Sequence, residues 1–260
     1  MDAAGPVAAQ QRELFWIVVP VLGFVVWPVL ILAPLIAWHY RLSNKGGAYR
    51  PNWNFSWILE GFIWIPPTMI VIGLAALLWG YTERLDPYRT IPGASSLEVQ
   101  AIAFDWKWVF VYPEKGIASV NRLVVPVGRP VRLALTSTTV MQSILIPQLG
   151  GQIFAMQGMQ TQLNLRADRT GKFRGANMQY NGSGFPREVF VVEAVDPAQF
   201  DQWLASADRT APVFSRSVQA VLAERATVEV PNIYARVPAG YFASMIAEGK
   251  LHAAVNGTSQ

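Results

Sequence analysis

The chain has 260 residues, of which 52% are hydrophobic and only 15% are charged, and its formal net charge is +4. This composition is too apolar for an ordinary soluble domain and predicts membrane-spanning segments. Lys and Arg are scattered along the chain rather than clustered, which argues against a nucleic-acid-binding surface. No cysteine occurs in the 260 residues, so disulfides, thiolate metal sites and cysteine nucleophiles are excluded within them.

Two apolar segments, residues 14–38 and 57–81, are each long enough to cross a hydrocarbon core of roughly 30 Å. The first contains no charged residue, and the second contains only Glu60. A cleaved signal peptide is the alternative for the first segment. That segment is too long for a signal peptide, however, and it ends at the bulky Trp38 rather than at small residues. We therefore expect a transmembrane hairpin within residues 1–95.

The connection between the two spans, residues 39–56, determines the expected orientation. It contains Arg41, Lys45 and Arg50, whereas the segment before the first span contains only Arg12. Basic residues are enriched in cytoplasmic connections, so this loop should lie in the cytoplasm. Both termini, and everything that follows the second span, should then lie on the opposite side of the membrane.

After the second span the pattern changes to short strands separated by Gly and Pro, which is typical of a β-sandwich. We expect this sandwich to occupy residues 96–195. Its strands should include residues 97–104, two strands within 122–138, and residues 161–167 and 187–195. The run 197–207 has apolar residues at helical spacing, and residues 196–260 should form a short helical C-terminal extension.

Near the end of the sandwich, the segment GKFRGANMQYNGSGFPREVFVV (171–192) has the outline of a metal-binding loop. Glycines are distributed along it, and a predicted strand leaves it. Soft metals such as copper prefer Cys, His and Met ligands. This loop has no Cys or His, and the two histidines of the chain, His39 and His252, lie far from it in the sequence. The loop therefore has the spacing of a metal site without suitable ligands.

Together with VMQSILIPQLGGQIFAMQGM (140–159), this loop resembles the matching region of subunit II of the haem-copper oxidases. The resemblance extends over nearly the whole chain and is specific enough to indicate the branch of cytochrome bo-type ubiquinol oxidases. It also includes YRPNW (49–53), DWKW (105–108), YPEKGIA (112–118) and IPQLGGQI…AMQGMQT (146–161). The resemblance implies a two-helix transmembrane hairpin followed by an all-β, cupredoxin-like Greek-key sandwich.

In cytochrome c oxidases of this family, the same region binds a dinuclear copper centre. In those relatives the six ligand positions hold, in chain order, His, Cys, Glu, Cys, His and Met. They correspond here to Gln142, Asn177, Gln179, Asn181, Phe185 and Glu188. All six residues differ from those of the copper-binding relatives. Amides and a phenyl ring cannot replace bridging thiolates, so we expect no metal and no cofactor bound by this chain. Cytochrome c would then not be a partner, because the copper centre is its port for electrons.

The resemblance implies a subunit of a proton-pumping oxidase in the bacterial inner membrane that oxidises ubiquinol and reduces dioxygen to water. Haems and a copper ion would lie in subunit I. This chain would stabilise subunit I and cover its periplasmic face, in the company of subunits III and IV and of membrane lipid. The two spans would make the chain multi-pass, with both termini and the β-domain periplasmic.

Glu60 is the one acidic residue of the second span. A carboxylate at the centre of a span costs roughly 2.5 kcal/mol or more, but Glu60 lies near the cytoplasmic end. Without the resemblance, the position of Glu60 favours a simple acidic residue at the membrane interface, with no role in proton transfer. The resemblance implies proton entry into the channel that passes a Lys of subunit I. The correspondence between Glu60 and the proton-entry residue of the family is based on the upstream motif YRPNW (49–53) and on the spacing between that motif and Glu60.

Two alternatives remain open. The chain could be a membrane-anchored periplasmic assembly or docking module with no part in turnover. An anchor of that kind has no reason to keep Glu60, which is the discriminating feature. Trp106 and Trp108 could be electron relays, but their large rings are better interpreted as packing groups.

Overall fold

The structure, a computed structural model, describes residues 2–41, 43–44, 52–228 and 230–257, the last six of these by their backbone alone. Lys45, Arg50 and residues 49–51 of the YRPNW motif lie outside the described residues, and so does the side chain of His252. The chain forms two compact units. One is Arg12–Arg84, and the other combines Met1–Gln11 with Leu85–Gln260.

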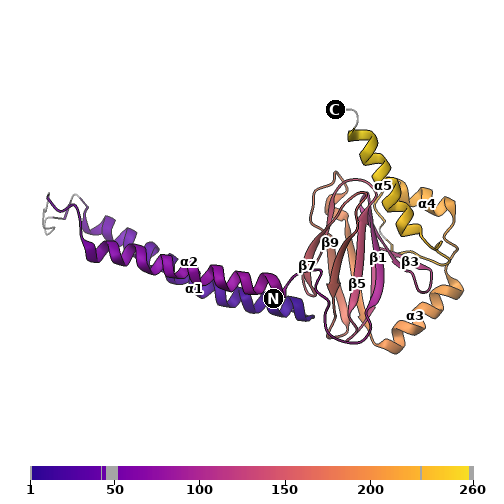
Figure 1. The fold of residues 1–260 in the computed structure, drawn as a ribbon, viewed down its shortest axis with the longest axis horizontal. Helices are drawn as coiled ribbons and strands as arrows, with labels where there is room; N and C mark the ends of the chain where they lie inside the picture. The colour runs from indigo at the N-terminus through magenta and orange to yellow at the C-terminus, as the bar shows by residue number, and fades with distance from the viewer. Residues whose placement is uncertain (1, 42, 45–51, 229, 258–260) are drawn as a thin grey trace. The chain divides into compact units, whose positions relative to one another are not determined.

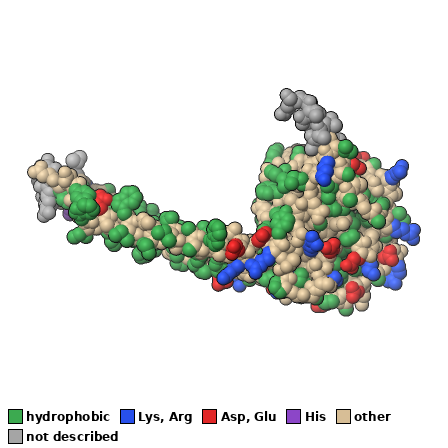
Figure 2. Space-filling model, in the orientation of Figure 1, with side chains coloured by type: hydrophobic (Ala, Val, Ile, Leu, Met, Phe, Trp, Pro, Cys, Tyr) green, Lys and Arg blue, Asp and Glu red, His purple; other side chains and the backbone are tan. Residues whose placement is uncertain are grey.

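The first unit contains most of helix α1 (Pro6–His39) and all of helix α2 (Trp57–Arg84). Both helices are long and apolar enough to cross a membrane, with mean hydropathies of 2.5 and 2.0 over their most apolar stretches. Their apolar side chains are largely exposed, and hydrophobic groups cover much of the helices in Figure 2. Both helices contain prolines, each of which removes one backbone hydrogen bond. Membrane helices tolerate this where neighbouring groups satisfy the freed carbonyl. The two predicted apolar helices are therefore confirmed.

The second unit is a β-sandwich of two sheets (Figure 1). The six-stranded sheet has the order β11 (Ile233–Tyr234), β3 (Ile117–Val120), β2 (Lys107–Tyr112), β1 (Leu97–Phe104), β5 (Val131–Ser137) and β8 (Thr161–Leu165). The five-stranded sheet has the order β4 (Arg122–Pro126), β10 (Val189–Val195), β9 (Gly171–Asn177), β6 (Gln142–Ile146) and β7 (Gly150–Ala155). Neighbouring strands are antiparallel, except that β1 pairs with β5 and β4 with β10 in parallel. Non-consecutive neighbours of this kind agree with the expected cupredoxin-like sandwich.

The inward-facing residues of the two sheets are almost all apolar, and together they form the core between the sheets. Trp108 is fully buried there, with ring centroids 6.5 Å from Phe110 and 6.1 Å from Phe190. The buried Tyr112 hydroxyl donates to the Val124 carbonyl and accepts from the Val124 amide, both at 2.8 Å. This pair of bonds ties the six-stranded sheet to the five-stranded sheet.

Three helices follow the sandwich: α3 (Pro197–Thr210), α4 (Arg216–Ala223) and α5 (Tyr241–Gly257). A second apolar cluster joins α4 and α5 to the outer face of the six-stranded sheet. The helical extension expected after the sandwich is thus present. The boundaries proposed for the three regions, 1–95, 96–195 and 196–260, stay predictions.

Candidate functional site

The predicted metal-binding loop connects β9 with β10 at one end of the five-stranded sheet. Asn177, the last residue of β9, fixes the start of the loop. Its side-chain oxygen accepts from the amides of Ser143, at 3.0 Å, and Gln179, at 2.9 Å. Asn favours such local side-chain-to-backbone bonds, and here they turn the chain out of the sheet. A short 3-10 helix, Phe185–Arg187, then leads the chain back toward β10.

Three of the six replaced positions come together in one buried cluster. Glu188 is 1% exposed, and its Oε2 accepts from the side-chain amides of Asn177, at 2.9 Å, and Asn181, at 2.6 Å. Asn177 also donates to the carbonyl of Gln179, at 2.8 Å. A carboxylate therefore holds the loop together through two amide groups, at the positions where the resemblance places two cysteines and a methionine.

Burial raises the pKa of Glu188 to about 7, although the hydrogen bonds from Asn177 and Asn181 act in the opposite direction. Its second oxygen, Oε1, is buried without a hydrogen bond of normal geometry among the described residues, and the indole of Trp108 favours the charged form less than the two amides do. Taking an ion out of water without full hydrogen bonding disfavours its charged form. The carboxyl of Glu188 therefore holds its proton up to a higher pH than an ordinary glutamate does.

The side chain of Trp106 packs against the loop and bonds to its backbone. It has a left-handed backbone (φ 67°), and its indole N–H donates to the carbonyl of Asn181 at 3.3 Å. A Cβ added at Gly184 would lie 2.1 Å from the Trp106 ring, so only glycine allows this close approach. At Gly182 the backbone is itself left-handed, with a φ of 116°. Two glycines of the loop are thus required by the ring and the turn.

The other replaced positions have different partners. Gln142, at the start of β6, is fully buried and donates to the carbonyl of Phe104 at 3.0 Å. Phe185 lies on the 3-10 helix and contacts Tyr180 edge to face, with centroids 5.7 Å apart. Gln179 joins the buried cluster through its backbone.

These residues do not fit a dinuclear copper centre. Its bridging thiolates have no counterpart, since the two cysteine positions hold Asn177 and Asn181, whose amide groups are bonded to Glu188. Amide and carboxylate oxygens are hard ligands, and soft copper prefers sulfur and imidazole. Among the described residues, no group of three or more His, Cys, Asp or Glu side chains could hold a metal ion. We derive no electron-transfer step through this loop.

Charged residues next to the cluster were not recognised from the sequence. Asp105 accepts from the Thr139 hydroxyl and from Arg225, each at 2.8 Å. Lys107 is 1% exposed and donates to the carbonyl of Glu224 at 2.5 Å. Burial lowers the pKa of Lys107, against the opposing effect of nearby acids. The acidic and basic residues of the DWKW motif could have indicated buried charges at this position. Their partners could not be identified, because they lie more than 30 residues away in the sequence.

Glu60 lies in the first turn of α2, where the positive end of the helix dipole favours a carboxylate. Its Oε2 accepts from the indole N–H of Trp64, one turn later, at 3.0 Å. Ser56 precedes the helix, and its carbonyl accepts from the Glu60 amide at 2.9 Å. The carboxylate is thus oriented by its own helix, and it belongs to the other compact unit from the loop cluster.

The fold and the remodelled loop together define a cupredoxin-like subunit II of the oxidase type. The family model for the periplasmic domain of cytochrome c oxidase subunit II matches residues 114–195. Over 225 residues the chain is 39% identical to cytochrome bo(3) ubiquinol oxidase subunit 2 of Pseudomonas putida, covering 86% of this chain and 72% of that protein. It is 36% identical to ubiquinol oxidase subunit 2 of Acetobacter aceti, covering 95% and 81%. The chain belongs to this family of ubiquinol oxidase subunits 2.

A solved structure is similar to part of this chain. The periplasmic domain of cytochrome oxidase subunit II from Bradyrhizobium japonicum is 25% identical, with a TM-score of 0.42. The match covers 45% of this chain and 96% of that structure. The family assignment rests on the sequence relatives.

Proposed function

We propose that this chain is the non-copper subunit II of a proton-pumping oxidase, which oxidises ubiquinol and reduces dioxygen to water. Its sandwich stabilises and covers subunit I, where the haems and a copper ion of the complex would lie. The complex includes subunits III and IV and lies with lipid in the bacterial inner membrane. Both termini and the sandwich are periplasmic. The chain itself carries no electrons.

The loop cluster is the observation that supports this proposal. Asn177 and Asn181 both donate to the carboxylate of Glu188 where copper ligands would otherwise lie. The loop is nevertheless folded on Trp106 and its glycines, so it has a structural role that does not require a metal. Electrons from ubiquinol, an apolar donor in the membrane, would enter subunit I directly. Cytochrome c would have no port on this chain.

Glu60 is the residue through which this chain would take part in turnover. Its carboxylate lies in the first turn of α2, and the proposed orientation places that turn at the cytoplasmic surface. There it would collect protons for the channel that passes a Lys of subunit I. The bond from Trp64 holds one carboxylate oxygen, Oε2, in place.

The test is Glu60→Gln in the assembled oxidase, with Glu83→Gln as the matched control. Glu83 lies in the last turn of the same helix, at its opposite end. Glu60→Gln should slow both quinol oxidation and proton uptake, because an amide cannot take up and release a proton as a carboxylate does, while Glu83→Gln keeps both rates. If Glu60→Gln has the rates of the unaltered oxidase, the proton-entry role is wrong. If the chain also fails to co-purify with a haem-containing subunit, a docking module becomes the better account.

A further inference from the structure

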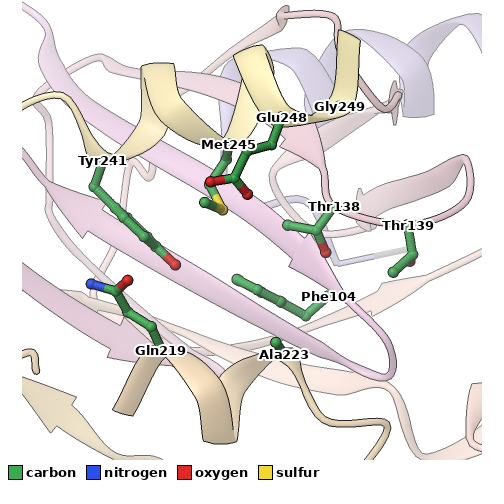
Figure 3. A pocket seen from close by; sticks show the side chains of 9 residues that line it. All are labelled: Phe104, Thr138, Thr139, Gln219, Ala223, Tyr241, Met245, Glu248 and Gly249. Atoms are coloured by element: carbon green, nitrogen blue, oxygen red, sulfur yellow. The ribbon is translucent and has the colours of Figure 1, made fainter. Parts of the chain in front are cut away.

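A pocket of about 320 Å³ lies between the C-terminal helices α4 and α5 and the ends of strands β1 and β5. Such a volume is at the lower end of the range for small-molecule sites. Figure 3 shows the side chains of α5 on one side and those of α4 on the other, with the end of β1 between them. The nine lining residues are Phe104, Thr138, Thr139, Gln219, Ala223, Tyr241, Met245, Glu248 and Gly249.

The walls combine one negative charge with apolar groups. Glu248 is the single charged side chain among the nine, and its carboxylate faces the same space as the ring of Tyr241 (Figure 3). Phe104 and Met245 supply the apolar surface. Glu248 is an exposed residue of α5, and both a carboxylate and the face of an aromatic ring attract cations. An anion would meet no positive side chain among these nine.

The two threonine hydroxyls offer acceptors to a ligand, while the side chains of Gln219 and Tyr241, which also line the pocket, can donate as well as accept. Thr138 already donates to the carbonyl of Ala103 at 3.1 Å, and Thr139 donates to Asp105 at 2.8 Å. A hydroxyl has one hydrogen to donate, so both oxygens have only lone pairs left for a ligand. The two threonines therefore present acceptors, in agreement with the carboxylate of Glu248.

Tyr241 contributes no second charge. Burial raises the pKa of its phenol to about 12, and the charge of Glu248 acts in the same direction. The hydroxyl therefore stays protonated at physiological pH. Its ring provides a neutral aromatic wall next to a single carboxylate, which matches a ligand with one positive charge.

We propose that this pocket binds a small primary alkylammonium ion. The ammonium group donates to Glu248 and to the free lone pairs of the threonine hydroxyls, and the alkyl chain packs on Phe104 and Met245. Because the walls come from α4, α5 and the sandwich, the bound ion joins these elements and stabilises their association. Two lining residues have bonds toward the loop region, since Phe104 accepts from Gln142 and Thr139 donates to Asp105, whereas Glu60 belongs to the other compact unit.

The experiment is a calorimetric titration of the purified full chain in detergent with butylammonium chloride. The unaltered chain should give a saturable heat, and sodium butyrate, which carries the opposite charge, should give none. Glu248→Gln should weaken the binding at least about tenfold, since it removes the charge that attracts the cation. Glu114→Gln removes an exposed carboxylate in the turn between β2 and β3 and should bind like the unaltered chain.

A second variant keeps Glu248 but fills the pocket with a lysine side chain of the protein itself. Ala223 is exposed at the end of α4, so Ala223→Lys should fold and place its own ammonium group next to Glu248. It should abolish butylammonium binding. The proposal is overturned if the unaltered chain gives no saturable heat, if butyrate binds as well as butylammonium, or if Glu248→Gln and Ala223→Lys both bind as the unaltered chain does.

Discussion

Replacing Glu188 by Gln should change how the stability of the sandwich depends on pH. Glutamine has nearly the same shape and can accept the same bonds from Asn177 and Asn181, but it cannot ionise. The variant therefore resembles the neutral form of the carboxyl at every pH. It separates the charge of Glu188 from its role in packing the loop.

The magnitude follows from the two pKa values. In the folded chain the pKa of Glu188 is about 7, against an ordinary value of 4.5. The folded state thus binds the proton more tightly than the unfolded state. Its contribution to stability is fully present below pH 4.5 and is lost as pH rises through 7. A shift of this size corresponds to about 3 kcal/mol in the free energy of unfolding.

The assay is urea unfolding of the full chain in detergent, followed by tryptophan fluorescence on both sides of this pH window. Trp106 and Trp108 lie next to the loop and contribute to this signal together with the other eight tryptophans of the chain. The free energy of unfolding should fall with rising pH in the unaltered chain, and Glu188→Gln should remove about 3 kcal/mol of that fall. Glu114→Gln should keep the full dependence. Equal pH profiles for the unaltered chain and Glu188→Gln would refute the reasoning.

Two further substitutions test the packing. Tyr112→Phe removes both bonds to Val124 and leaves a buried N–H and C=O unpaired, so it should cost about 1–3 kcal/mol in urea unfolding; an unchanged midpoint would contradict the inter-sheet role of the hydroxyl. Gly184→Ala places a methyl group 2.1 Å from the Trp106 ring and should cost about 1–3 kcal/mol, with a shift in tryptophan emission. Unchanged stability and emission would show that the ring and loop are not closely packed.

The sequence predicts those strands whose inward and outward residues alternate or whose ends carry turn residues. Strand β1 has the predicted bounds, Leu97–Phe104. Strand β2, Lys107–Tyr112, was not predicted, because all six of its residues are buried and no alternation marks it. The two-residue β11 (Ile233–Tyr234) exists only through its pairing with β3. Such pairing depends on tertiary contacts that no local pattern records.

For the loop, the six replaced positions could be identified from spacing and resemblance, but their interactions could not. Glu188 bonds to Asn177 across 11 residues and to Asn181 across seven, and either Asn could equally have faced solvent. The burial that raises the pKa of Glu188 comes from the surrounding sandwich. Likewise, the left-handed backbone of Trp106 could not be predicted from the sequence, because it depends on the packing of the loop against the Trp106 ring.

The central claim is that this chain provides no port for electrons from a protein donor. The most direct measurement is steady-state oxygen consumption by the assembled oxidase with ubiquinol or with reduced cytochrome c as the donor. Ubiquinol should support turnover, and reduced cytochrome c should not be oxidised above the rate without enzyme. Rapid oxidation of cytochrome c by the complex, abolished when this chain is removed, would contradict the account.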